Sequence, residues 1–159
     1  MTTGEHMNTK DELRQLINNA RCLMDNLPGL IFIKDTEFNF VECSYDFSSL
    51  VKINKKDIIG QTDYNLPWAG YADVYRRRDE GALKGITSIE LELMPINKNT
   101  LLTVKASKHP IRNSDGEIIG VLGQTDVLSS KDELGKLLSA VIPIDKKNTA
   151  HSKIGRAHV

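Results

Sequence analysis

The sequence predicts an α+β fold with an antiparallel sheet, and two observations support this class. Five short runs have strand composition, and the last three, at 88–93, 101–107 and 118–127, are joined by hairpin-length connections. The segments between the second and third runs, 45–60 and 71–84, lack strand alternation and favour helices. A doubly wound parallel sheet is excluded because parallel strands need long crossover connections.

A helix is expected at the N-terminal end, over Asp11–Asn26. Thr9 and Glu12 have the spacing of a capping box, and Pro28 and Gly29 end the helix. Apolar residues recur between them at helical spacing: Leu13, Leu16, Ile17, Ala20, Leu23 and Met24. This stripe is too wide to be left bare on a small domain, so we expect the helix to form a parallel homodimer, the alternative being that it packs back on the sheet.

Two strands and several helices follow in the first half of the chain. Leu30–Lys34 fits a buried strand, and Phe38–Cys43 fits a second strand after a turn at Asp35–Glu37. Tyr45–Gly60 is expected to form short helices. A longer helix is expected over Tyr71–Lys84. The residues of this helix expected to face inward are Ala72, Tyr75, Ala82 and Leu83. Those expected to face solvent are Arg76, Arg77, Arg78, Asp79 and Glu80.

Alternation predicts the remaining strands. In Ser88–Leu93 the residues Ile89, Leu91 and Leu93 alternate with Glu90 and Glu92, which is typical of a sheet with one wet face. The same alternation continues over 101–107 through Leu102, Val104 and Ala106, and Asn113–Gly116 supplies a hairpin turn before 118–127. After the last strand, a capping box and an apolar stripe predict one more helix, which involves Ser130, Glu133, Leu134, Leu137, Leu138 and Val141.

The composition is that of one ordinary globular domain. A chain of 159 residues is too short for two full domains. Its 21 basic and 21 acidic residues cancel, so we expect no nucleic-acid binding and no attraction to membranes. Cys22 and Cys43 lack metal-ligand or redox spacing and are interpreted as reduced structural thiols. Neither a signal peptide nor a membrane span is evident, which favours a cytoplasmic protein.

Three segments together resemble the PAS family. They are Leu27–Asp35, Asp57–Asp63 and Asn113–Gly123, and the likeness spans Leu27–Val127. Leu66–Trp68 adds a Leu-Pro-Trp motif, which looks like a bacterial subgroup found upstream of histidine kinase or LuxR-type output regions. The order and spacing of these segments carry the resemblance, since no single motif is decisive.

The resemblance implies a PAS-like five-stranded antiparallel sheet with covering helices, plus N-terminal and C-terminal flanking helices for dimerisation and output. We therefore expect a tail and flanking helix at 1–26, the PAS domain at 27–128, an output helix at 129–142 and a disordered tail at 143–159. The last residues, 153–159, look like a translated sequencing adapter, so we expect the natural protein to continue differently and to carry its output region there.

The chain departs from the family pattern at two places. Cys43-Ser44 stands where the subgroup commonly has Cys-Asn, so an amide that ties the next turn is missing. Leu128 stands where many members have a threonine after the final strand, although the preceding Asp126 is kept. We expect Asp126 to couple the sheet to the output helix, the alternative being a solvated acid without a special partner.

The sequence contains no signature for a flavin or haem cofactor and no catalytic motif, so whether the protein binds a cofactor stays unknown. The flavin-binding Asn-Cys-Arg-Phe-Leu-Gln segment is absent, the 71–84 helix has no histidine for haem, and His109 beside Pro110 fits a hairpin. Metalloprotease, nucleotide-binding and hydrolase motifs are also absent. The carboxylates Asp57, Asp63, Asp73 and Glu80 are interpreted as solvated, and an enzyme is not expected.

An aromatic group in the segment that covers the sheet supplies the candidate ligand pocket: Phe47, Tyr64, Trp68, Tyr71 and Tyr75. These residues form either ordinary core packing or the lining of a cavity. The favoured function is a sensory module that binds a small ligand or partner and relays a conformational signal in cis. A structural dimerisation domain with a filled core, or a small enzyme, are the alternatives.

Overall fold

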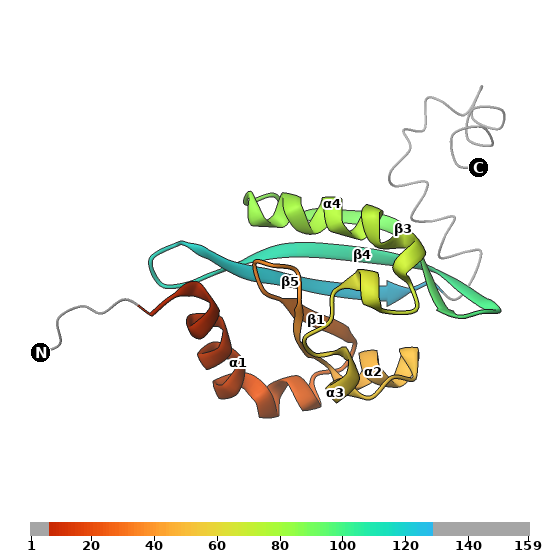
Figure 1. Ribbon diagram of the computed structural model, residues 1–159, viewed down its shortest axis with the longest axis horizontal. Helices are drawn as coiled ribbons and strands as arrows, with labels where there is room; N and C mark the ends of the chain where they lie inside the picture. The colour runs from red at the N-terminus through yellow and green to blue at the C-terminus, as the bar shows by residue number, and fades with distance from the viewer. Residues whose placement is uncertain (1–6, 129–159) are drawn as a thin grey trace, which may run out of the picture. The chain divides into compact units, whose positions relative to one another are not determined.

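A five-stranded antiparallel sheet forms the centre of the computed structural model, which describes residues 7–128 (Figure 1). Its strands are β1 (Leu30–Lys34), β2 (Phe40–Cys43), β3 (Ser88–Asn97), β4 (Thr100–Arg112) and β5 (Ile118–Val127). They lie in the order β2-β1-β5-β4-β3, and every neighbouring pair is antiparallel. The predicted fold class is confirmed.

Helices lie on both faces of the sheet. They are α1 (Thr9–Asn26), α2 (Tyr45–Val51), α3 (Lys55–Ile58) and α4 (Ala72–Leu83), with short 3₁₀ helices at Asp63–Asn65 and Ala69–Tyr71. Figure 1 shows α4 above the β4–β5 hairpin and α1 below it. Among the described helices, none has both the length and the apolar character needed to cross a membrane.

The outer face of the sheet is covered by α1. Leu13, Ile17 and Met24 pack there with Ile33 and Ile119, so much of the predicted apolar stripe packs back on its own domain. Two remaining members of the stripe stay accessible, with Leu16 45% and Leu23 60% exposed.

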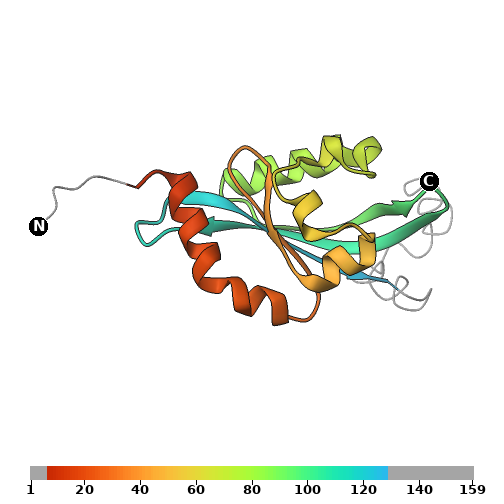
Figure 2. The same ribbon diagram turned by 60° about the horizontal axis from the view of Figure 1, so that its bottom comes forward.

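The first turn of α1 is capped by Asn8, whose side chain accepts a hydrogen bond from the Asp11 backbone amide at 2.8 Å. The predicted Thr9 cap is wrong, because the helix begins at Thr9 itself. The same turn lies beside the tip of the β4–β5 hairpin, where Asn113 donates to the Glu12 carboxylate at 3.1 Å (Figure 2). This hydrogen bond therefore ties the start of α1 to the turn between β4 and β5.

β3 alternates as predicted, but its inward side carries Glu92 and Met94 in place of the predicted apolar residues, while Glu90 stays exposed as predicted. Ile89 and Leu93 point outward and are 63% and 44% exposed, whereas the Glu92 side chain is only 6% exposed. Glu92 turns inward because Arg78 of α4 covers that side and pairs with its carboxylate. On β4 the predicted inward residues Val104 and Ala106 are buried as expected.

The start of α2 is tied down by Ser44, which stands in place of the amide of the family pattern. The Ser44 hydroxyl donates to the Gly29 carbonyl at 2.7 Å and accepts from the Ile31 amide at 3.1 Å and the Phe47 amide at 3.3 Å. The serine therefore caps α2 and fastens it to the start of β1.

The helix expected at 129–142 and the tail expected at 143–159, with its final segment 153–159, lie outside the described residues.

Candidate functional site

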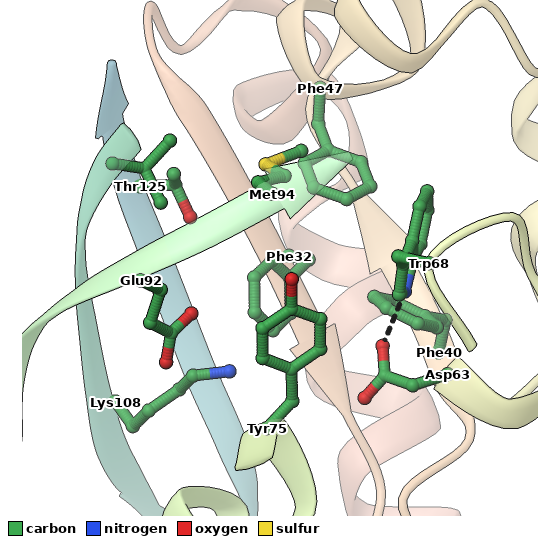
Figure 3. Close-up of a pocket in the computed structure, with 11 residues that line it drawn as sticks. Phe32, Phe40, Phe47, Asp63, Trp68, Tyr75, Glu92, Met94, Lys108 and Thr125 are labelled. Carbon is green, nitrogen blue, oxygen red and sulfur yellow. Dashed lines mark hydrogen bonds between the residues drawn. The ribbon is translucent and has the colours of Figure 1, made fainter. Parts of the chain in front are cut away.

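A small cavity lies between the inner face of the sheet and the segment that contains α2, α4 and the 3₁₀ helices. Its volume is about 30 Å³, which is room for about one or two water molecules. Residues from every strand and from the covering segment line it: Phe32, Phe40, Phe47, Asp63, Trp68, Tyr75, Glu92, Met94, Val104, Lys108 and Thr125. Figure 3 shows how these side chains converge.

Aromatic rings make up much of the wall. Phe32 and Phe40 meet edge to face with ring centroids 5.4 Å apart, and Trp68 lies 6.0 Å from Phe47 in a similar arrangement. Gly123 makes room for this packing, because a Cβ atom there would collide with the Phe32 ring. A side chain on β5 at this position would therefore displace one wall of the cavity.

A buried cluster of four charged residues adjoins the rings. The Lys34 ammonium lies 2.5 Å from Asp63 Oδ2 and 2.5 Å from Asp79 Oδ2, and the Lys108 ammonium lies 3.1 Å from Asp79 Oδ1. All four residues are at most 4% exposed. Burying charges is tolerated only when each finds a partner, and here each ion has at least one.

The surroundings keep Lys34 and Asp79 ionised. Burial alone would lower the pKa of Lys34, but the charges of Asp63 and Asp79 outweigh it and raise that pKa. Burial would likewise raise the pKa of Asp79, but Lys108 and then Lys34 hold it below its usual range. Both groups therefore carry full charge at neutral pH.

Lys108 and Asp63 bring this cluster to the cavity itself. The Lys108 ammonium lies over the Phe32 ring, 4.7 Å from its centroid, and 5.8 Å from that of Tyr75. Across the cavity, the Trp68 indole donates to Asp63 Oδ1 at 2.7 Å (Figure 3). The cavity thus has an aromatic lining with a cation on one side and an anion on the other.

Tyr75 and Glu92 complete the polar part of the lining. The Tyr75 hydroxyl donates to the Leu93 carbonyl at 2.5 Å, and burial, followed by the charge of Glu92, raises the pKa of Tyr75. The tyrosine is therefore a neutral hydrogen-bonding group at physiological pH. Figure 3 shows the Glu92 carboxylate turned toward the side of the cavity that holds Lys108.

The predicted pocket residues divide into two groups. Phe47, Trp68 and Tyr75 line the cavity. Tyr64 is 44% exposed and donates to Asp73 at 2.6 Å, away from the lining. Tyr71 stacks on Tyr75 with ring centroids 6.5 Å apart and supports the wall from behind.

Two predictions about charged residues are wrong. Asp79, predicted on the wet face of its helix, and Asp63, predicted to be solvated, are both buried against their lysine partners. The arginine run does not form one exposed face either. Arg78 pairs with Glu92, and the Arg76 guanidinium stacks 4.1 Å from the centroid of the Phe38 ring.

Several lining residues are not evident from the sequence, above all Glu92, Lys108 and Phe32. A usable signal exists for Lys108, because it continues the inward phase of Val104 and Ala106 on β4. A charged residue in the buried phase of a strand is rare and points to a partner or a ligand.

Cys43 and Asp126, two further residues singled out from the sequence, lie outside the cavity lining. Burial raises the pKa of the Cys43 thiol to about 11, which makes it unreactive. Asp126 forms a half-exposed ion pair with Lys105 at 3.5 Å. Over residues 7–128, no group of three or more such side chains is placed to hold a metal ion.

Comparison with known proteins identifies the fold family of this architecture. The family model described as PAS fold matches residues 24–130. A solved structure of VqmA bound to DPO is 25% identical with a TM-score of 0.62, and the match covers 75% of this chain and 59% of that one. A search of curated proteins gave no match.

Two further structures show the range of similarity. The VqmA dimer of Vibrio cholerae, described among LuxR-type receptors, is 25% identical with a TM-score of 0.62, covering 78% of this chain and 52% of that one. The PAS domain of Bordetella pertussis BvgS is 18% identical with a TM-score of 0.55, covering 79% and 96%. This chain therefore spans between half and three fifths of these VqmA chains.

Proposed function

Because this chain belongs to the PAS fold family, we propose that it is a sensory module that binds a small molecule in the cavity between its sheet and its helices. VqmA, at 25% identity, binds DPO, which supports a small-molecule ligand for this chain as well. A sensing role needs no catalytic group, and we propose that the module is not an enzyme.

One observation carries the proposal: hydrogen-bonding groups from separate parts of the fold converge on an aromatic cavity. Asp63 precedes α4, Glu92 comes from β3 and Lys108 from β4, and all three line the same space. A core that served stability alone would gain from apolar side chains at these positions. Ligand pockets usually have an apolar lining that contains a small number of well-placed polar groups.

The present volume means that a ligand must displace side chains to enter. A cavity of about 30 Å³ has no room for a molecule of several heavy atoms. Binding therefore selects a more open arrangement of the lining, which gives the module two states to report. Met94, a buried unbranched side chain packed with the aromatic residues, is the most adaptable member of the lining.

Native mass spectrometry of the protein purified from its own host tests the proposal. We expect a bound small molecule in the wild type, and its loss in Lys108→Met. Lys98→Met is the matched control, because Lys98 lies exposed between β3 and β4. Retention of the molecule by Lys108→Met, or its loss from both variants, would reject this pocket as the binding site.

A structural dimerisation domain is the second candidate, and the small cavity is the observation that favours it. If the rings merely fill the core, the interior is already close-packed and no ligand is needed. Protein from the native host would then carry no small molecule, and cavity-lining variants would change stability alone.

We propose that α1 supplies the dimer contact. Its Leu16 and Leu23 remain exposed after the rest of the stripe has packed on the sheet, and the relative VqmA is described as a dimer. Light scattering is expected to show a dimer that Leu16→Glu dissociates. Gln15→Glu, a charge change at an exposed neighbouring position, serves as the control. A wild-type monomer at high micromolar concentration contradicts this contact.

We also propose that β5 relays the signal to an output region in cis, with Asp126 at the point of exit. Thr125 lines the cavity, and Asp126 next to it pairs with Lys105 of β4. Asp126→Ala is expected to leave the sheet folded and to speed hydrogen exchange only over residues 130–141, within the predicted output helix. Unchanged exchange there, together with unchanged output from the full-length natural protein, counts against the relay.

The type of output region is the remaining part of the proposal. We expect a histidine kinase or a LuxR-type DNA-binding region. VqmA supports the second, because its Vibrio cholerae chain, described among LuxR-type receptors, extends well beyond the part that this chain matches. Such outputs act in the cytoplasm, which we propose as the location. Sequencing the gene with long reads tests the proposal directly, since it should reveal an output region in frame.

A further inference from the structure

The charges of the buried cluster cancel. Lys34 and Lys108 supply two positive charges, and Asp63 and Asp79 supply two negative charges. The elevated pKa of Lys34 and the depressed pKa of Asp79 keep these two groups ionised at neutral pH. The charges of a second, partly buried pair, Arg78 with Glu92, also cancel. The cavity wall is therefore polar without carrying a net charge.

This balance determines what kind of molecule the cavity accepts. An anion placed beside Lys108 would also face the carboxylates of Asp63 and Glu92, which line the same small space. A cation beside either carboxylate would face Lys108. In both cases the incoming ion loses its water and meets no net opposite charge to compensate.

An uncharged molecule with polar atoms avoids this penalty. The Lys108 ammonium has three N–H donors, and its carboxylate partner within residues 7–128 is Asp79 Oδ1. Asp63 and Glu92 offer acceptor oxygens on the lining. A neutral ligand can therefore accept from Lys108 and donate to a carboxylate while the cluster keeps its balance.

We propose that the charge-balanced cluster restricts the cavity to uncharged ligands and that Asp79 is the residue that sets this selectivity. Asp79 is fully buried behind the lining and is not part of it. It holds both lysines, so it acts through Lys108 as a positioning residue and not by contact with a ligand. The inference rests on the proposed function and names the ligand class of the same site.

Three probes of similar shape test the proposal: benzoate, benzamide and benzamidinium, which carry a negative, no and a positive charge. Trp68 is the only tryptophan and lines the cavity, so its indole N–H signal reports binding in a titration followed by NMR. In the wild type we expect benzamide to bind at least about tenfold more tightly than either ion, because an unpaired ion is expelled from a buried site.

Two variants shift the balance in opposite directions. Asp79→Asn leaves one excess positive charge beside the cavity and is expected to raise benzoate affinity relative to benzamide by about tenfold or more. Lys108→Met leaves one excess negative charge and should favour benzamidinium in the same way. Asp73→Asn is the matched control, since Asp73 lies on the same helix but is exposed and bonded to Tyr64.

The possible outcomes separate this inference from the proposed function. Benzoate or benzamidinium binding as tightly as benzamide to the wild type overturns the selectivity. If Asp79→Asn does not change the relative affinities for the three probes, the role of Asp79 is overturned. If that variant does not fold, unchanged relative affinities in Lys108→Met overturn the same role, because Asp79 acts through Lys108. Titrations in which no probe shifts the Trp68 signal overturn the proposed pocket itself, and this inference with it.

Discussion

The two faces of the sheet bury different kinds of side chain. The cluster packed under α1 on the outer face is apolar, with Leu13, Ile17 and Ile119 at its centre. The inner face joins aromatic rings to four buried charges. The apolar cluster needs only contact and exclusion of water, whereas each ion on the inner face needs its own partner. The comparison separates a face that stabilises the fold from a face that keeps polar groups at a cost in stability.

Asp79→Ala is the sharpest test of the inner face. It leaves Lys108 without its carboxylate and Lys34 with only one, so we expect a loss of about 3–5 kcal/mol in the free energy of unfolding. Urea denaturation measures it. Asp73→Ala, on the exposed side of the same helix, should cost less than about 1 kcal/mol.

The effect of Asp79 should also depend on pH. Its folded pKa lies below the ordinary 3.8, so its contribution is present above that pH and is lost as the pH falls through the folded value. The difference between wild type and Asp79→Ala should therefore shrink in acid. If the difference in the free energy of unfolding between wild type and Asp79→Ala stays constant below pH 3.8, Asp79 is not ionised in the folded protein.

Leu13→Ala is the corresponding test of the outer face. Leu13 is 1% exposed at the contact between α1 and β5, so removing its side chain should cost about 2–4 kcal/mol. Unlike Asp79→Ala, this loss should not vary with pH. Gln15→Ala, at an exposed position of the same helix, is the control and should change stability by about 0.5 kcal/mol or less.

Gly123→Ala probes the inner face without touching its charges. The new methyl group would push against the Phe32 ring, which should cost about 1–3 kcal/mol and reshape the cavity. Thermal unfolding measures the stability, and the Trp68 indole signal reports the cavity. Gly70→Ala is matched, because no atom lies within 4 Å of a Cβ added there. Equal effects of the two substitutions would mean that Phe32 moves aside freely.

Ser44→Ala should have the smallest effect. It removes the cap of α2 and leaves the Ile31 amide without its hydroxyl acceptor, for a loss of about 1 kcal/mol. Ser48→Ala provides the comparison within the same helix, because its hydroxyl is exposed and donates only to a nearby carbonyl. If both variants unfold at the same urea concentration as the wild type, the cap contributes nothing measurable.

The order of helices and strands could be predicted from the sequence, because the spacing of apolar residues that distinguishes a helix from a strand is visible within a short segment. The ranges Leu30–Lys34 and Ile118–Val127 predicted from it are the bounds that β1 and β5 have. Alternation does not say which face turns inward, however. In β3 that choice depends on Arg78 of α4, which captures Glu92, so Glu92 lies on the inward side of the strand, against the prediction.

From the sequence, the candidate site is predictable in part of its aromatic lining and, through the inward phase of β4, at Lys108. Phe47, Trp68 and Tyr75 are found because large rings near a sheet commonly pack into the core, a rule to which the 44% exposed Tyr64 is the exception. Asp79 and Lys34 are not connected by any such signal, because 45 residues separate them in the chain and no local pattern links a helix acid to a strand lysine. Such a pair emerges only once the topology is known.

The place of β5 in the sheet has a consequence for the growing chain on the ribosome. The last strand to be synthesised lies between β1 and β4, where Leu30 pairs with Thr125 and Val104 with Val127. Before β5 emerges, β1–β2 and β3–β4 can form only as separate hairpins, which are marginal alone.

Closure of the sheet is therefore the final event in making this domain, and it depends on contacts between distant parts of the chain. Nascent chains that stop before Val127 expose the edges of both hairpins and both halves of the inner core to quality-control proteases. The residues after Val127 are thus translated only once the last strand of the sheet has been synthesised.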